Sequence, residues 1–155
     1  MNWAEVIANP ALRDLPFKIE LNQWGLIEMS PASTWHSGLQ GRVLAYLIRK
    51  NMGGEAAPEM AVATTIGVRV ADAVWRSAGH IRVNAYDSPL NVAPELCVEV
   101  RSESNTNAEF EAKTRAYLAA GAQEVWWVEL DARVRVFNQS GEVSGSAIVG
   151  ELPVI

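Results

Sequence analysis

Two carboxylates and one amine stand out in this chain because each lies among apolar side chains. Asp72 alternates in phase with the valines at positions 68, 70 and 74, so it shares one face of an extended segment with apolar neighbours. A carboxylate on such a face is costly unless it is paired, hydrogen-bonded or bound to a metal. Asp72 is therefore either a metal ligand or a structural aspartate that is hydrogen-bonded at a strand end or faces Arg69 or Arg82.

Glu99 and Lys113 offer a second acid and an amine within reach of each other. Glu99 lies between two valines in the extended segment 95–101, where it is either an exposed edge residue or a ligand inside the sheet. Lys113 shares one helical face with Phe110 and Tyr117, three residues before it and four after it. It can extend its stem over the apolar surface. Alternatively, because its helix follows the segment that carries Glu99, it can reach over the end of that strand.

The chemistry that needs these residue types together is metal-assisted hydrolysis of a phosphodiester. Two carboxylates on neighbouring strands can hold a hard divalent ion such as Mg²⁺, which keeps several waters and contacts phosphate oxygens. A metal lowers the pKa of a bound water and neutralises charge that develops in the transition state. A nearby ammonium can orient that water or stabilise the added negative charge. Arg101, on the same face as Glu99, could stabilise charge but could not take up a proton, because a guanidinium stays protonated.

The elements that must position these residues follow from periodicity and caps. Apolar spacing and the N-cap residue Ser33 predict a long helix up to Gly53, and the capping box formed by Thr106 and Glu109 starts another that Gly121 ends. A short helix covers residues 3–8. Alternation and β-branched residues predict strands at 17–21, 26–29, 62–66, 68–75, 95–101, 125–128 and 134–137, followed by a peripheral hairpin at the Gly/Ser-rich end.

The strand–helix–strand order of residues 95–129 predicts a parallel pair joined by a crossover helix. The predicted hairpins add antiparallel strands, so the sheet should be mixed. With 155 residues, 49% of them apolar, the chain has room for one domain, residues 1–155. The fold class is therefore α/β, with a mixed central sheet flanked by helices.

Charge and cysteine usage limit the partners and the location. A formal net charge of −5 argues against tight, sequence-blind coating of nucleic acid, because lysine and arginine supply most of that affinity. A metal held by carboxylates could still meet the phosphate, and the partner subunit of a homodimer could add basic surface. The single cysteine, Cys97, lies in an apolar run and suits a reducing compartment. We expect a cytoplasmic protein that has no membrane span and no signal peptide.

These residues resemble the PD-(D/E)XK nuclease superfamily, and in detail its Uma-type family of restriction endonucleases. The resemblance covers nearly the whole chain, and its most specific part runs from Ala93 to Val100. The other matching positions are Ile19-Glu20-Leu21, Gly25 to Pro31, His36, Gly67 to Asp72, Ser102, Ser104-Asn105-Thr106, Glu109, Lys113, Tyr117 and Gly121 to Trp126.

The resemblance implies a restriction-endonuclease-like fold and a nuclease. For this nuclease we expect a Mg²⁺ ion that Mn²⁺ can replace, and DNA as the substrate. The resemblance also implies that Asp72, Glu99 and the main-chain carbonyl of Val100 ligate the metal, and that the lysine of the superfamily has moved to the helix position of Lys113. The strand position where the superfamily generally has lysine carries Arg101 here, which leaves open which cation serves the site. Ala71 likewise replaces the proline usual before the aspartate.

Two functions are compatible with this pattern. The first is a Mg²⁺-dependent endonuclease that hydrolyses phosphodiester bonds of DNA, built on Asp72, Glu99 and Lys113. The second is a catalytically inactive nuclease-fold protein that acts as a binding or dimerisation module, which the net acidity and Ala71 would suit. Absence of any divalent metal binding would favour the second. His36 belongs to the matched pattern but is equally explained as a packing histidine on the apolar side of its helix.

Overall fold

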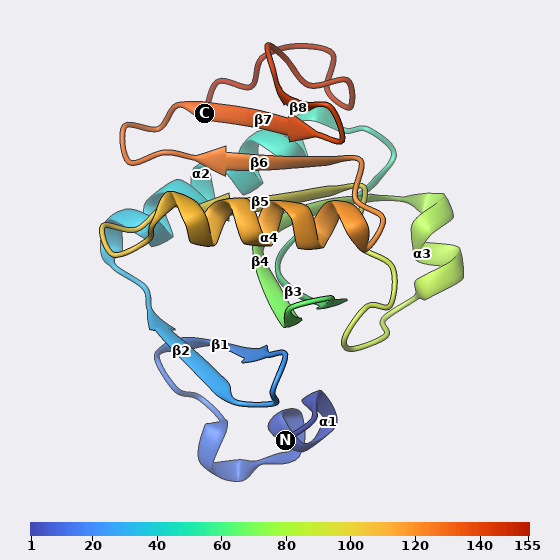
Figure 1. Cartoon of the computed structure of the whole chain (residues 1–155). Helices are drawn as coiled ribbons and strands as arrows, with labels where there is room; N and C mark the ends of the chain where they lie inside the picture. Colours follow the sequence, from blue (N-terminus) through green and yellow to red (C-terminus); the bar gives the residue numbers. More distant parts are fainter.

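One mixed sheet of eight strands organises the chain, which a computed structural model describes over residues 1–155 (Figure 1). The helices are α1 (Trp3–Ala8), the 3₁₀ turn η1 (Pro10–Leu12), α2 (Thr34–Lys50), α3 (Ala78–Asn84) and α4 (Asn107–Ala119). The strands are β1 (Phe17–Asn22), β2 (Ile27–Pro31), β3 (Gly54–Thr64), β4 (Gly67–Ser77), β5 (Leu96–Val100), β6 (Glu124–Val128), β7 (Val134–Asn138) and β8 (Gly141–Val143).

Strand β4 is shared by two parts of the sheet, and this sharing creates the space for a site. The order is β2-β1-β4-β5-β6-β7-β8, and β3 pairs with β4 along almost its whole length. Strands β1 and β5 must therefore both use the other edge of β4. β1 pairs only with Gly67 and Val68 at its start, and β5 pairs with Ala73 to Trp75 near its end. The edge between these two contacts, which includes Asp72, has no strand partner.

The predicted caps position the two helices that flank this gap. The side chain of Ser33 accepts a hydrogen bond from the N–H of His36, which fixes the start of α2. Thr106 and Glu109 form the predicted capping box at the start of α4. At the end of α2, Asn51 adopts the left-handed conformation with φ of 48°, so the helix ends there, slightly before the glycines at 53 and 54.

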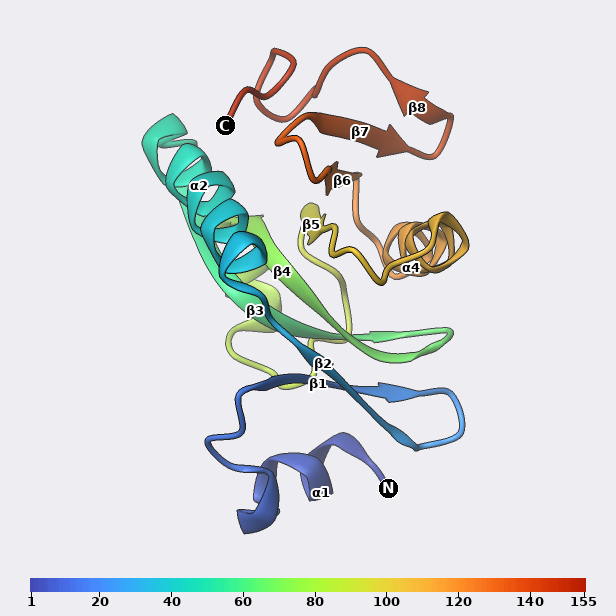
Figure 2. The same ribbon diagram turned by 90° about the vertical axis from the view of Figure 1, so that its left-hand side faces the viewer.

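The two long helices cover opposite faces of the sheet (Figure 2). Helix α2 packs on the face formed by the even-numbered residues of β5, in a core that includes Leu39, Val43, Leu96 and Val98. Helix α4 packs on the odd-numbered face, in a core with Phe110, Tyr117 and Cys97. Glu99, also odd-numbered, therefore faces α4. No helix is both long enough and apolar enough to span a membrane.

The predicted strand–helix–strand unit is confirmed, since β5 and β6 pair in parallel from Leu96–Glu124 to Val100–Val128. The fold class is likewise confirmed as a mixed α/β sheet flanked by helices. Three segments differ from the predictions. Residues 78–84, expected as an irregular region, form helix α3, which Ser77 caps. Strand β3 begins at Gly54, earlier than predicted, and the predicted terminal hairpin is limited to the short strand β8 against β7.

Candidate functional site

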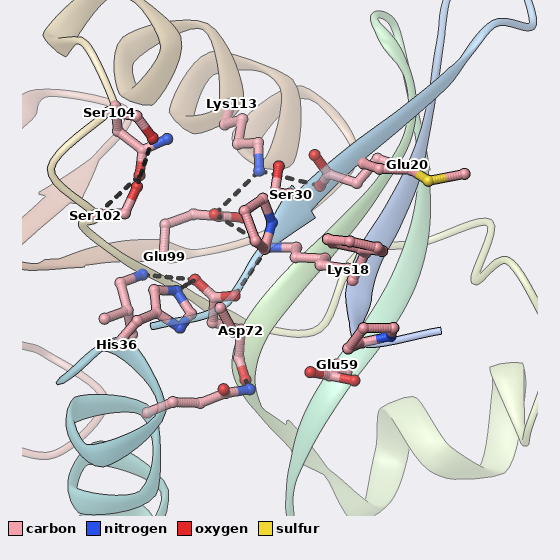
Figure 3. Close-up of a pocket in the computed structure, with 18 of the residues that line it drawn as sticks. Lys18, Glu20, Ser30, His36, Glu59, Asp72, Glu99, Ser102, Ser104 and Lys113 are labelled. Carbon is pink, nitrogen blue, oxygen red and sulfur yellow. Dashed lines mark hydrogen bonds and ion pairs between the residues drawn. The ribbon is translucent and has the colours of Figure 1, made fainter. Parts of the chain in front are cut away.

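A pocket of about 460 Å³ opens where β1 separates from β4 (Figure 3). The β1–β2 hairpin, the middle of β4, the end of β5, the start of α2, the loop before α4 and the middle of α4 contribute to it. Charged and polar side chains form much of its wall: Lys18, Glu20, Ser30, His36, Gln40, Glu59, Asp72, Glu99, Ser102, Ser104, Asn105 and Lys113.

Asp72 lies at the unpaired edge of β4 and is only 2% exposed. Its Oδ1 accepts a hydrogen bond from Lys18 Nζ at 2.8 Å. Its Oδ2 accepts one from the main-chain N–H of Val100 at 2.7 Å and lies 3.4 Å from His36 Nε2. The side chain of Gln40 donates to its main-chain oxygen. The Asp72 side chain thus satisfies the Val100 N–H, and the Gln40 side chain satisfies the Asp72 carbonyl. These side chains replace hydrogen bonds that a neighbouring strand would otherwise have formed.

Glu99 is buried beside Asp72, on the adjacent strand. β4 and β5 are antiparallel with Ala73 opposite Val98, so the same register continued by one residue brings Asp72 opposite Glu99. Glu99 Oε1 accepts a hydrogen bond from the Tyr117 hydroxyl at 2.8 Å. Oε2 accepts one from Lys113 Nζ at 3.1 Å. The same Oε2 lies 3.5 Å from Lys18 Nζ.

Glu20 is a third buried carboxylate, contributed by β1. Its Oε1 accepts hydrogen bonds from Lys113 Nζ at 3.0 Å and from the main-chain N–H of Val70 at 2.8 Å. Its Oε2 lies 3.4 Å from the guanidinium of Arg69, which also pairs with Glu28. Lys113 therefore bridges Glu20 and Glu99, and Glu20 ties β1 to β4 where the two strands separate.

The charges of this cluster shift the pKa values of its members in opposite directions. Burial favours the neutral amine of Lys18, but the carboxylates of Glu99 and Asp72 outweigh it and raise its pKa above the ordinary range. Burial opposes ionisation of Asp72, yet Lys18 and His36 hold its carboxyl pKa well below the usual range. Burial raises the pKa of Glu99, with the Asp72 carboxylate acting in the same direction against the two lysines. Of the two acids, Glu99 is therefore the one whose ionised form an added positive charge would stabilise more.

The structure brings together three of the four side chains predicted from the sequence. Asp72, Glu99 and Lys113 meet in the pocket, and Val100 also lines it. Arg101 lies elsewhere. It pairs with Glu129, and its guanidinium lies 4.4 Å from the ring centroid of Phe110. Arg101 thus stays on the odd-numbered face that α4 covers, but Glu129 and the Phe110 ring engage its guanidinium, and it does not line the pocket.

The predicted catalytic set did not include three ionisable residues that contact its members in the pocket: Lys18, Glu20 and His36. Lys18 and Glu20 belong to a hairpin whose place in the sheet was not predicted, although Glu20 was part of the matching pattern. His36 was noted, but packing explained it equally well; its ring lies beside Asp72. Lys18 and Glu20 alternate across Ile19 and so share one face of β1. That two-residue spacing was the available signal.

The oxygen donors fit a small divalent cation that is held by few protein ligands. No group of three or more His, Cys, Asp and Glu side chains converges on one ion-sized position. Mg²⁺, however, keeps several waters and is commonly bound through one or two carboxylates. Asp72 and Glu99 supply two, and both contact the same ammonium, that of Lys18. A position between two carboxylates that attracts an ammonium also suits a metal cation.

The mixed sheet, the two flanking helices and the buried acid–lysine cluster define an α/β domain of the nuclease-like class. The sequence matches the profile of the Uma2 family, described as "Putative restriction endonuclease", over residues 10–151. The chain belongs to this family. Its structure is similar to the crystal structure of "a putative nuclease belonging to DUF820" from Anabaena variabilis, with a TM-score of 0.72 and 16% sequence identity over 92% of this chain and 83% of that chain. No curated protein matches the chain.

Proposed function

We propose that this protein is a Mg²⁺-dependent endonuclease that hydrolyses phosphodiester bonds of DNA. The observation that carries the proposal is the meeting of Asp72 and Glu99, from adjacent strands, with Lys113 in one solvent-open pocket. Membership of a family described as restriction endonucleases supports the same reaction class. Mn²⁺ should replace Mg²⁺, because both are hard ions that carboxylate oxygens bind.

Asp72 and Glu99 are the proposed metal ligands, with the main-chain carbonyl of Val100 as a third donor. A bound divalent ion would supply a water of lowered pKa and neutralise negative charge on the phosphate. The protein fixes its side of the arrangement in advance. The Val100 N–H holds one oxygen of Asp72, and the Tyr117 hydroxyl holds one oxygen of Glu99. Both carboxylates therefore need little reorganisation to receive a cation and a substrate.

Lys113 is the proposed electrostatic group of the reaction. Glu20 and Glu99 accept hydrogen bonds from its Nζ, which keeps the amine at the pocket wall. A positive charge held at that place can stabilise the negative charge that increases on the phosphate oxygens during attack by water. Arg101 is not assigned a direct role, because its guanidinium is engaged by Glu129.

We further propose that the protein acts as a homodimer. Cleavage of both strands of a duplex needs two sites, and a two-fold pair supplies them with the same residues. Sedimentation equilibrium should give twice the mass of the chain; a monomer at all concentrations would refute this part alone.

The direct test is incubation of purified protein with supercoiled plasmid and Mg²⁺ or Mn²⁺. The wild type should nick or linearise the plasmid, and chelation with EDTA should stop it. Asp72→Asn and Glu99→Gln should each lower the rate by about 100-fold or more. Lys50→Gln, which removes a surface charge paired with Glu151 at the other end of α2, is the matched control and should cleave normally.

Unchanged cleavage by both carboxylate variants would refute the site. A protein that binds Mn²⁺ at Asp72 and Glu99 but cleaves neither DNA nor RNA would instead be a nuclease-fold binding module. Cleavage of RNA but not of DNA would support the proposed site and refute DNA as the substrate.

A further inference from the structure

Lys18 occupies an unusual position, between the two carboxylates proposed to hold the metal. Its Nζ lies 2.8 Å from Asp72 Oδ1 and 3.5 Å from Glu99 Oε2 (Figure 3). Its side chain is 13% exposed, and those of the two acids are 3% and 4% exposed. An ammonium in contact with both acids neutralises like charges that would otherwise repel each other at close range.

The strand that carries Lys18 leaves this residue freer to move than the rest of the cluster. The backbone of β1 pairs with β4 only through Leu21 and Asn22, while the backbone of Lys18 lies opposite Ser30 of β2 alone. The lysine side chain has a flexible four-carbon stem, and its ammonium group can donate hydrogen bonds in several directions. Lys18 can therefore turn out of the space between the acids without disturbing the sheet.

Lys113 differs from Lys18 in both respects. It is anchored on helix α4, and it bridges Glu99 to Glu20 rather than to Asp72. Divalent coordination by Asp72 and Glu99 leaves the contact of Lys113 with Glu20 intact. The same coordination conflicts directly with the contacts of Lys18, because the cation and the ammonium would require the same carboxylate oxygens.

We propose that Lys18 is a built-in counter-ion of the metal site, which competes with the divalent cation for Asp72 and Glu99 and is displaced when the cation binds. The inference rests on the proposed ligand role of these two acids. In the metal-free protein Lys18 keeps the carboxylates together. After displacement its ammonium remains at the pocket, where it adds a positive charge for a phosphate group. The site thereby exchanges one cation for another and never leaves both acids unneutralised.

The test is calorimetric titration of Mn²⁺ into wild-type protein and into Lys18→Gln. Because wild-type protein binds the ion only in the fraction of molecules whose Lys18 has moved away, removal of the ammonium should tighten Mn²⁺ binding by about tenfold. Lys18→Arg keeps a competing charge and should bind Mn²⁺ no more tightly than the wild type. Lys50→Gln controls for the change in net charge and should also bind as the wild type does.

Thermal unfolding supplies a second readout that does not depend on activity. Without metal, Lys18→Gln should unfold at a lower temperature than the wild type, because two buried carboxylates lose their shared partner. Saturating Mn²⁺ should raise its unfolding temperature more than that of the wild type. If Lys18→Gln does not fold without metal, refolding it in the presence of Mn²⁺ tests the same dependence, and failure to recover there counts against the proposal.

Equal or weaker Mn²⁺ binding by Lys18→Gln would overturn the inference, as would absence of Mn²⁺ binding in every variant. The result is separable from the nuclease proposal. Tighter binding by Lys18→Gln in a protein that cleaves nothing would sustain the counter-ion role and refute the enzyme. Plasmid cleavage that needs Asp72, combined with unchanged Mn²⁺ affinity in Lys18→Gln, would support the enzyme and refute the counter-ion role.

Discussion

Asp72 Oδ2 accepts a 2.7 Å hydrogen bond from the main-chain N–H of Val100, beyond the last paired residues of β4 and β5, Ala73 and Val98. A side chain therefore continues the connection between the two strands after their backbone pairing has ended. The carboxylate that we propose as a metal ligand also holds the second strand in place. Structural and chemical roles of Asp72 must be separated by the choice of substitution.

Asp72→Asn should separate them, because an amide oxygen can still accept the hydrogen bond from Val100. We expect a loss of about 1 kcal/mol in the free energy of unfolding for Asn and about 3 kcal/mol for Asp72→Ala, which leaves the Val100 N–H unsatisfied. Both should lose cleavage by about 100-fold or more. Urea unfolding and plasmid cleavage measure the two effects. Equal destabilisation by Asn and Ala would contradict the structural role.

Lys113→Met should lower kcat by about 100-fold with little change in KM, because the proposed charge stabilisation acts mainly in the transition state. Lys113→Arg should recover only part of kcat, since a planar guanidinium cannot replace a point charge held between Glu20 and Glu99. Steady-state cleavage of a short labelled duplex gives both constants. A rise in KM alone would mean that Lys113 only binds substrate.

Tyr117→Phe should destabilise the protein by about 1 kcal/mol, because Glu99 loses a buried hydrogen bond. The same substitution should weaken Mn²⁺ binding, since one oxygen of Glu99 is no longer held. Tyr46→Phe is the matched control. Its hydroxyl donates to the exposed Glu151, outside the pocket, so Mn²⁺ affinity should not change. Equal Mn²⁺ affinity in both variants would show that Tyr117 does not position Glu99.

Glu20 should make the stability of the protein depend on pH. Burial opposes its ionisation, but Lys113, Lys18 and the Val70 N–H hold its carboxyl pKa below the usual range. A carboxyl whose pKa is lower in the folded state stabilises the fold above its unfolded pKa, about 4.3, and this contribution is lost as the pH falls toward the folded pKa. Glu20→Gln should therefore be less stable than the wild type at pH 7, by about 3 kcal/mol.

The difference between wild type and Glu20→Gln should shrink as the pH falls below about 4. Urea unfolding at a series of pH values measures it. Glu111→Gln on α4 is the control, because the Glu111 side chain is exposed and forms no ion pair, so its loss should cost little at any pH. A difference that stays constant down to acid pH would show that the charge of Glu20 is not what stabilises the hairpin.

Local signals in the sequence were enough for most elements and for part of the site. The capping box at Thr106, the N-cap at Ser33 and the alternation of residues 95–101 depend on neighbours in the chain, so α4, α2 and β5 were predicted near their observed bounds. Asp72 was found because it interrupts an apolar face, and Glu99 because the crossover helix brings Lys113 near it and the family pattern contains both. Helix α3 was missed because its seven residues follow no clear apolar period.

Local signals in the sequence could not predict the contacts of Lys18, Glu20 and Arg101. No local pattern shows that β1 and β5 use the same edge of β4, or that Glu129 engages Arg101. The sequence by itself determined most of the helices and strands and singled out the two acids, since these follow from period, caps and the cost of burying charge. Only the tertiary structure decided which cations face those acids, because long-range strand pairing sets which side chains share a pocket.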